Sequence, residues 1–137
     1  MTPEQAYHEL CYYTLAHGDP AFIHQYVVDA YAAQTIDVDA KPIKSTFALV
    51  GLYLHLERGY NGREVQRAHV RLAAQRKDWP MFALPTDRGA LSAVDVLAHT
   101  PGPARDIAID AWCASVWAAY RDVHGSVAAM LHARGFA

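Results

Sequence analysis

The chain has 137 residues, of which 53% are hydrophobic and 19% charged, and its net charge at neutral pH is −2. This composition favours a compact globule over a disordered chain, and the length suits one domain that spans residues 1–137. The weak net charge excludes a global electrostatic attraction to nucleic acid or to an anionic membrane surface.

The same sequence gives no sign of export or of membrane insertion. The first residues lack a basic stretch followed by an apolar one, and the longest apolar run without a charge covers only residues 45–56, too short to span a bilayer. Cys11 and Cys113 lie far apart in apolar segments. We therefore expect a reduced, cytoplasmic protein whose cysteines pack as inert side chains.

Capping signals divide the first half of the chain into helices. Residues 2–5 (TPEQ) form a capping box that begins a helix, and Gly18 is expected to end it after residue 17. Asp19 and Pro20 are predicted to restart the chain at once as a second helix over 20–34. Residues 35–43 are predicted to form a loop.

Further helices are predicted over 44–58, 63–77, 93–99 and 103–134. The helix at 44–58 is apolar nearly all round, which is typical of a central helix. Gly125 lies inside the last helix, where it marks a kink or a close helix crossing. Residues 35–43 alternate polar and apolar but contain a proline, which favours a loop, and no segment is a convincing strand. The sequence therefore predicts an all-α, single-domain bundle of five or six helices.

Four of the eight histidines lie on apolar helix stripes, namely His17, His24, His55 and His69. Helical bundles build metal sites in their interiors from facing helices, and imidazole suits zinc and other divalent transition metals. A carboxylate often completes such a set, and either Asp29 or Asp110 could do so here. The pattern predicts an interior site for a small molecule or a metal such as zinc, with metal-assisted hydrolysis or transfer as the reaction if the protein is an enzyme.

A second interpretation of these histidines remains open. A histidine on an apolar stripe more often packs its ring and bonds one nitrogen to a backbone carbonyl or a hydroxyl. No two histidines have a diagnostic metal-binding spacing such as HxxxH. Gln25 and Asp29 lie one turn apart, and we expect them on a polar face of the second helix.

Exposed side chains suggest an alternative class of function. Trp79, Phe82 and Trp117 are predicted to lie on the surface, where they would serve a protein partner or a homodimer without catalysis. Asp110 is expected on the solvent side of the last helix. A row of arginines at 63, 67 and 71 lacks interleaved aromatic side chains, so a solvated face is favoured over nucleic-acid binding.

Four segments carry a resemblance to a known family: HELCYYTLAHGDPAFIHQYVVDAYAAQ, KPI, ALVGLYLHLERGYNGREVQRAH and AWCASVWAAYRDVH. Together they resemble an uncharacterised family of small bacterial proteins known only as a domain of unknown function. The matching positions are His17, Asp19, Phe22, His24, Gln25, Asp29 and Gln34. Tyr26 stands where the family commonly has a histidine, which leaves any ligand set that includes that position incomplete here. The resemblance covers nearly the whole chain, implies a stand-alone domain and brings no known activity.

Overall fold

The computed structural model describes residues 1–16 and 18–136 and confirms the all-α class. Within these ranges the chain forms seven α-helices, one short 3-10 helix and no strand. They are α1 (Pro3–Ala16), α2 (His24–Thr35), α3 (Pro42–Arg58), α4 (Gly62–Ala73), α5 (Ala93–Leu97), α6 (Pro103–Ala119), the 3-10 helix η1 (Arg121–Val123) and α7 (His124–Ala133). Seven helices replace the predicted five or six because the last predicted helix is divided in two.

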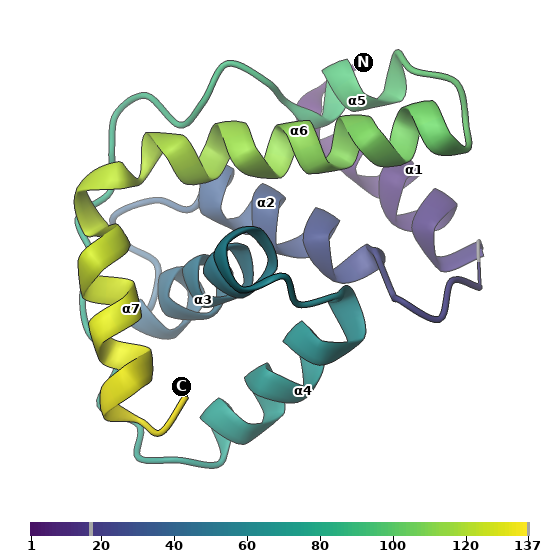
Figure 1. Cartoon of the computed structure of the whole chain (residues 1–137). Coiled ribbons are helices and arrows are strands. Elements are labelled where there is room, and N and C mark those ends of the chain that lie inside the picture. The colour runs from purple at the N-terminus through teal and green to yellow at the C-terminus, as the bar shows by residue number, and fades with distance from the viewer. Residues whose placement is uncertain (17, 137) are drawn as a thin grey trace.

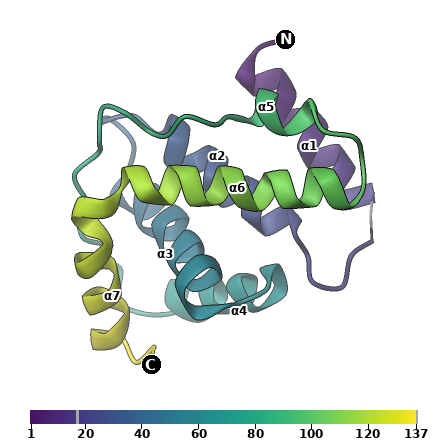
Figure 2. The same ribbon diagram turned by 45° about the horizontal axis from the view of Figure 1, so that its top comes forward.

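Helices α2 and α3 form the centre of the arrangement (Figure 1). Helix α6 packs along both of them, α4 packs against both from another side, and α7 packs against α3. Helices α1 and α5 lie together at the end where the chain begins (Figure 2). Each α-helix contributes to one cluster of buried apolar side chains. No helix in the described ranges is both long enough and apolar enough to cross a membrane.

Residues 19–22, between α1 and α2, form a structured turn (the α1–α2 turn), so the predicted helix start at residue 20 is wrong. The carboxylate of Asp19 accepts a hydrogen bond from the backbone N–H of Ala21 at 2.9 Å, which closes a local turn. Phe22 then adopts a φ of +56°, in the left-handed region that interrupts a right-handed helix. Helix α2 therefore begins only at His24.

The same turn packs on the start of α4, which the sequence located correctly. Asn61 and Glu64 form a reciprocal capping box, with N–H to side-chain oxygen distances of 2.8 Å and 3.0 Å. A Cβ at Gly62 would overlap the carbonyl oxygen of Phe22, so only glycine permits this close approach. The guanidinium of Arg63 lies over the Phe22 ring at 4.4 Å. The α1–α2 turn is thereby fixed against α4.

The last predicted helix bends at Tyr120, not at Gly125. The buried hydroxyl of Tyr120 donates to the carbonyl of Ala33 in α2 at 2.6 Å, which fixes this residue against the core. The ring of His124 stacks on Trp117 at 3.8 Å, and its Nε2 donates to the Trp117 carbonyl at 2.7 Å. These side-chain contacts stabilise the break, after which α7 turns sharply away from α6 (Figure 1).

An irregular connection over residues 74–92 runs between α4 and α5, and Arg88 fastens it. The Arg88 guanidinium donates to the carbonyls of Gln34 at 3.4 Å and Ile36 at 2.5 Å, where α2 ends. The Gln34 amide donates in turn to the carbonyls of Arg88 and Leu91, and its oxygen accepts from the indole of Trp112 in α6. Because Ile36 begins the loop after α2, Arg88 also fixes that loop.

Candidate functional site

A cavity of about 800 Å³ opens between α2, α3, α4 and the loop that follows α2. Most of its wall is apolar, and a few polar groups gather on α2 and α4. Its lining is formed by Gln25, Val28, Asp29, Tyr31, Ala32, Thr35, Ile36, Asp37, Asp39, Ala40, Lys44, Phe47, Ala48 and His69. A mostly apolar cavity of this size with convergent polar groups is typical of a small-molecule site.

Asp29 reaches the cavity from α2 and is the unusual group in it. Its side chain is only 4% exposed. The amide nitrogen of Gln25, one turn earlier, donates to Oδ1 at 3.2 Å, whereas Oδ2 is buried without a hydrogen-bond partner. Burial raises the pKa of Asp29 well above its ordinary value, and the Gln25 hydrogen bond only partly offsets that effect. The carboxyl is thus biased toward its neutral form.

Gly51 of α3 makes the space that the Asp29 carboxyl occupies. A Cβ built at Gly51 would lie 1.8 Å from Oδ2 of Asp29, well inside the contact distance of two atoms. The prediction that Asp29 lies on a polar face with Gln25 is therefore wrong for Asp29. Helix α2 is covered by α3 on that side as well, so its short polar stripe packs against a glycine instead of facing water.

His69 of α4 is the second ionisable group near the floor of the cavity. Its Nε2 donates to the carbonyl of Phe47 at 2.8 Å, because a carbonyl can only accept. Its Nδ1 therefore carries a lone pair, which faces the amide nitrogen of Gln25 at 3.5 Å. Burial lowers the pKa of His69 and keeps the ring neutral, although the Phe47 carbonyl opposes this shift. Gln25 thus lies between a carboxyl and a neutral imidazole.

His24 lies elsewhere, at the start of α2. Its Nδ1 is 2.9 Å from the hydroxyl of Thr14 on α1, and its ring contacts Phe22. Burial lowers the pKa of His24. Its contacts join α2 to α1, and it does not line the cavity of Asp29 and His69.

His55 has both ring nitrogens engaged outside the cavity. Nδ1 faces the carbonyl of Tyr60 at 3.2 Å, and Nε2 faces the carboxylate of Asp110 at 2.9 Å. Both partners are acceptors, so the ring satisfies both only when each nitrogen carries a proton. The ring also stacks on Tyr26 at 3.6 Å. Asp110 is exposed as predicted, and His55 links α3 to α6 with no nitrogen left for a metal.

The structure therefore does not assemble the predicted four-histidine site. His24, His55 and His69 bond to different partners on different elements, and His17 lies outside the described residues. Among the residues that the structure describes, no three His, Cys, Asp or Glu side chains gather in a way that can hold a metal ion. Of the predicted site residues that the structure describes, His69 and Asp29 are the two that share a cavity.

The aromatic side chains predicted for a partner surface are mostly inside. Phe82 and Trp117 belong to the core, where the Trp117 indole also donates to Glu57 at 2.8 Å. Trp79 is half-buried between the Phe47 ring and the Arg134 guanidinium. The prediction of surface exposure is thus wrong for Phe82, which the irregular connection contributes to the core, and for Trp117, on which the α6–α7 bend stacks the His124 ring.

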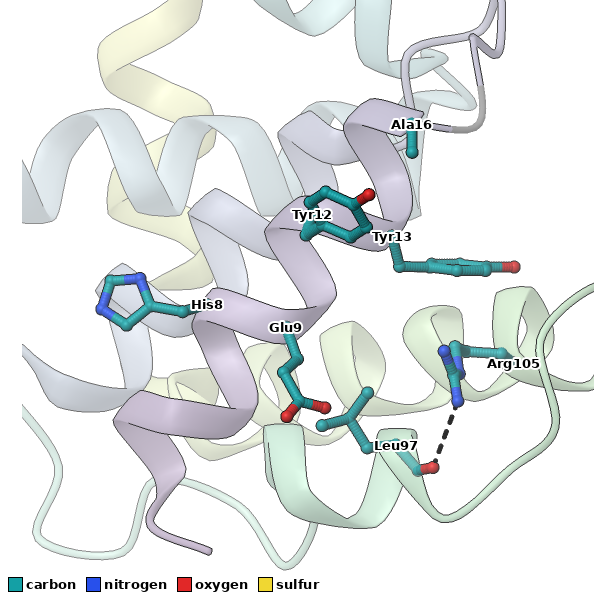
Figure 3. A pocket seen from close by; sticks show the side chains of 7 residues that line it. All are labelled: His8, Glu9, Tyr12, Tyr13, Ala16, Leu97 and Arg105. Atoms are coloured by element: carbon teal, nitrogen blue, oxygen red, sulfur yellow. Dashed lines mark hydrogen bonds between the residues drawn. The ribbon is translucent and has the colours of Figure 1, made fainter.

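A second hollow, of about 610 Å³, lies between α1, α5 and α6 (Figure 3). The Tyr13 hydroxyl donates to Asp106 at 2.8 Å and accepts from the N–H of Gly102 at 2.9 Å. Arg105 lies over the Tyr13 ring and donates to the carbonyl of Leu97 at 3.3 Å. These polar groups serve the fold, and the hollow holds no counterpart of the buried Asp29 carboxyl.

The sequence pointed to His69 and Asp29 but missed the residues that make their environment. Gln25 was read as a surface residue, and Phe47 supplies a backbone carbonyl that no pattern reveals. One signal was available in the isolated glycine at position 51, inside an otherwise apolar helix, where a glycine usually has a packing reason.

Comparison with known proteins gives a family and no activity. Searches of curated proteins and of solved structures find no significant match to this chain. The sequence profile of DUF5946, a family of unknown function, matches residues 4–121, from the first turn of α1 through the start of η1. This match covers most of the chain, including every residue that lines the cavity. The protein therefore belongs to the DUF5946 family.

Proposed function

We propose that the protein binds a small organic molecule in the cavity between α2, α3 and α4. The observation that carries this proposal is the buried Asp29 carboxyl, one oxygen of which has no hydrogen-bond partner in the protein. Buried polar atoms in folded proteins are nearly always satisfied, and the exceptions tend to have a functional reason. Asp29 lines the cavity, although Oδ2 itself lies buried against Gly51, so a ligand that draws the carboxyl toward the cavity would satisfy this oxygen.

The shape and lining of the cavity support the same proposal. Its volume of about 800 Å³ lies within the usual range of ligand pockets. Val28, Ala32 and Phe47 offer an apolar wall, and Gln25 and His69 stand beside Asp29 as further polar groups. A ligand with an apolar body and one polar end fits this distribution.

The pKa shifts give the site two neutral ionisable groups. Burial raises the pKa of Asp29 and lowers that of His69, so an acid and a base face one Gln25 amide. Such a pair can exchange a proton with a bound molecule. We favour binding as the function, since metal-assisted hydrolysis lacks a ligand cluster among the described residues and a partner surface lacks its aromatic anchors.

A cavity-filling substitution tests the proposal. Ala32 lines the cavity, so Ala32→Trp should fill it, whereas Ala129→Trp adds the same side chain to an exposed position on α7 outside the lining. A fragment mixture is screened by thermal shift against the wild type and both variants. Fragments that bind the cavity should raise the Tm of the wild type and of Ala129→Trp, and leave Ala32→Trp unchanged.

Two other results of this screen would contradict the proposed site. Equal shifts in all three proteins would place binding elsewhere, and no shift in any protein would leave the cavity without a ligand role. Circular dichroism of each variant before the screen checks that the helices are intact.

A further inference from the structure

The polar atoms at the floor of the cavity are mainly hydrogen-bond acceptors. Oδ2 of Asp29 has no partner, and Nδ1 of His69 carries a lone pair because Nε2 donates to Phe47. The contact of Nδ1 with the Gln25 amide is 3.5 Å long, at the weak limit of a hydrogen bond. Because Oδ2 is buried against Gly51, a ligand with several donors at one end would satisfy both atoms by drawing the Asp29 carboxyl toward the cavity.

The charges of the residues at the cavity mouth also favour a ligand rich in hydrogen-bond donors. Asp37 and Asp39 lie in the loop after α2, and Lys44 lies in the first turn of α3, all three exposed. Two carboxylates against one ammonium leave an excess of one negative charge at the mouth. The backbone N–H of Asp39 donates to the Asp37 carboxylate at 2.9 Å, which fixes its orientation. Such a mouth favours the approach of a cation.

We propose that the ligand of this cavity, if the proposed function holds, is a protonated amine that carries an apolar body. An ammonium group has N–H donors and no acceptor, which complements Oδ2 of Asp29 and Nδ1 of His69. The apolar body would lie against Val28, Ala32 and Phe47. The competing possibility is a ligand that accepts a hydrogen bond from a protonated Asp29, and an alcohol or a carboxylate would represent it.

The proton balance of this binding step can be written in full. Burial raises the pKa of Asp29, so the carboxyl keeps its proton to higher pH than an exposed one. When an ammonium enters, the carboxyl gives that proton to the solvent and an ammonium–carboxylate pair forms, with no other bond made or broken. Around Asp29, Gln25 and the Gly51 backbone carry no charge. Tyr7 and Cys113 also interact with Asp29, and burial raises the pKa of both, so both keep their protons and carry no charge; burial lowers the pKa of His69, which favours its neutral form.

Three linear six-carbon probes test the proposal: hexylammonium, hexanol and hexanoate. Their affinities are measured by titration while NMR signals of the cavity residues are followed. Hexylammonium should bind at least about tenfold more tightly than hexanol, and hexanoate most weakly. In Asp29→Asn, which keeps the shape but cannot ionise, the advantage of hexylammonium over hexanol should disappear. Asp122→Asn removes an exposed carboxylate outside the cavity and should leave the ranking unchanged.

The outcomes separate the two proposals. If hexanol or hexanoate perturbs the cavity signals with an affinity equal to that of hexylammonium, the preference for a cation is wrong and the binding site stands. If none of the three probes perturbs those signals, both proposals are overturned. Selective hexylammonium binding that survives Asp29→Asn also overturns the role of Asp29.

A calorimetric measurement tests the proton balance directly. Hexylammonium is titrated near pH 5 into the wild type and into Asp29→Asn, each in two buffers of different ionisation enthalpy, which reports the protons exchanged on binding. Net proton release by the wild type that Asp29→Asn lacks supports displacement of the Asp29 proton, because a proton displaced from His69 would be released by both proteins. Proton uptake, or no exchange, contradicts it.

Discussion

Asp29 is an ionisable residue held where its charge is costly. Its carboxyl is wedged between α2 and the backbone of Gly51, and it receives one hydrogen bond, from Gln25. The raised pKa means that the folded protein retains the Asp29 proton at pH values where the unfolded chain has lost it. In that range the free energy of unfolding falls as the pH rises. A residue of this kind lowers stability and is kept for another reason, which we assign to binding.

The first prediction follows from this fall in the free energy of unfolding with rising pH. Asp29→Asn cannot ionise, so it should be more stable than the wild type at neutral pH, by about 1–3 kcal/mol. The difference should shrink toward about pH 3, where the wild-type carboxyl is mostly protonated in both the folded and the unfolded chain. Urea unfolding across this pH range measures both quantities. A variant with the same pH dependence as the wild type would show that Asp29 is not the titrating group.

The second prediction concerns the fit of Asp29 to Gly51. Gly51→Ala places a Cβ where the carboxyl lies, so it should destabilise the fold by about 1–3 kcal/mol. In an Asp29→Ala background the same substitution should cost far less, since the Cβ meets free space and alanine favours a helix. Unfolding of the four proteins gives a double-mutant cycle. Additive effects would refute the direct contact.

Among the elements, helix α4 is the one whose position depends most clearly on a single missing side chain. Its first residue, Gly62, touches the carbonyl of Phe22 in the α1–α2 turn. The backbone N–H of Arg63 also donates to the carbonyl of Ala21 in this turn at 3.0 Å, and its guanidinium lies over the Phe22 ring. Helix α4 carries His69, which lines the cavity. The packing of the α1–α2 turn against α4 therefore helps to position one wall of the cavity.

The third prediction compares two helical glycines. Gly62→Ala should cost about 2 kcal/mol or more, because its Cβ would overlap backbone that cannot rotate away. Gly125→Ala meets nothing within 4 Å and should be neutral or stabilise α7 by up to about 1 kcal/mol. Calorimetric Tm values of the two variants check this contrast. Equal effects at the two positions would mean that the α1–α2 turn adapts freely.

For the molecule as a whole, the irregular connection over residues 74–92 depends on Arg88. The guanidinium joins this connection to the end of α2, and Gln34 joins the same region to Trp112 in α6. The loop at the cavity mouth begins at Ile36, whose carbonyl accepts a hydrogen bond from Arg88. The Arg88 side chain thus joins the irregular connection both to the buried end of α2 and to the loop at the cavity mouth.

The fourth prediction tests this role. Arg88→Lys keeps the charge but loses the planar fork of donors, so it should destabilise the protein by about 1–3 kcal/mol and open residues 74–92 to proteolysis first. Arg121→Lys, at an exposed position, is the matched control and should change neither quantity. Limited proteolysis followed by mass spectrometry identifies the first cut. A first cut elsewhere would contradict the role of Arg88.

The sequence could predict the features whose causes are local. The capping box at residues 2–5 forms as expected, and Gly59 ends α3 in the left-handed conformation. The break at Tyr120 was missed, because its cause is a hydrogen bond to Ala33, which is 87 positions away. Asp29 was assigned to a polar face for the same reason: its burial depends on a partner helix and on a glycine that only the packed structure brings opposite it.

The contact between Asp29 and Gly51 has a consequence for descent as well as for folding. A change at either position alters what the other can tolerate, so the two should be inherited as a pair across the DUF5946 family. Relatives that keep the aspartate should keep the glycine, and those that lose the aspartate should be free to carry alanine or serine opposite it. A family alignment would then mark, by covariation at these two columns, which members retain the buried acid and with it the same kind of ligand.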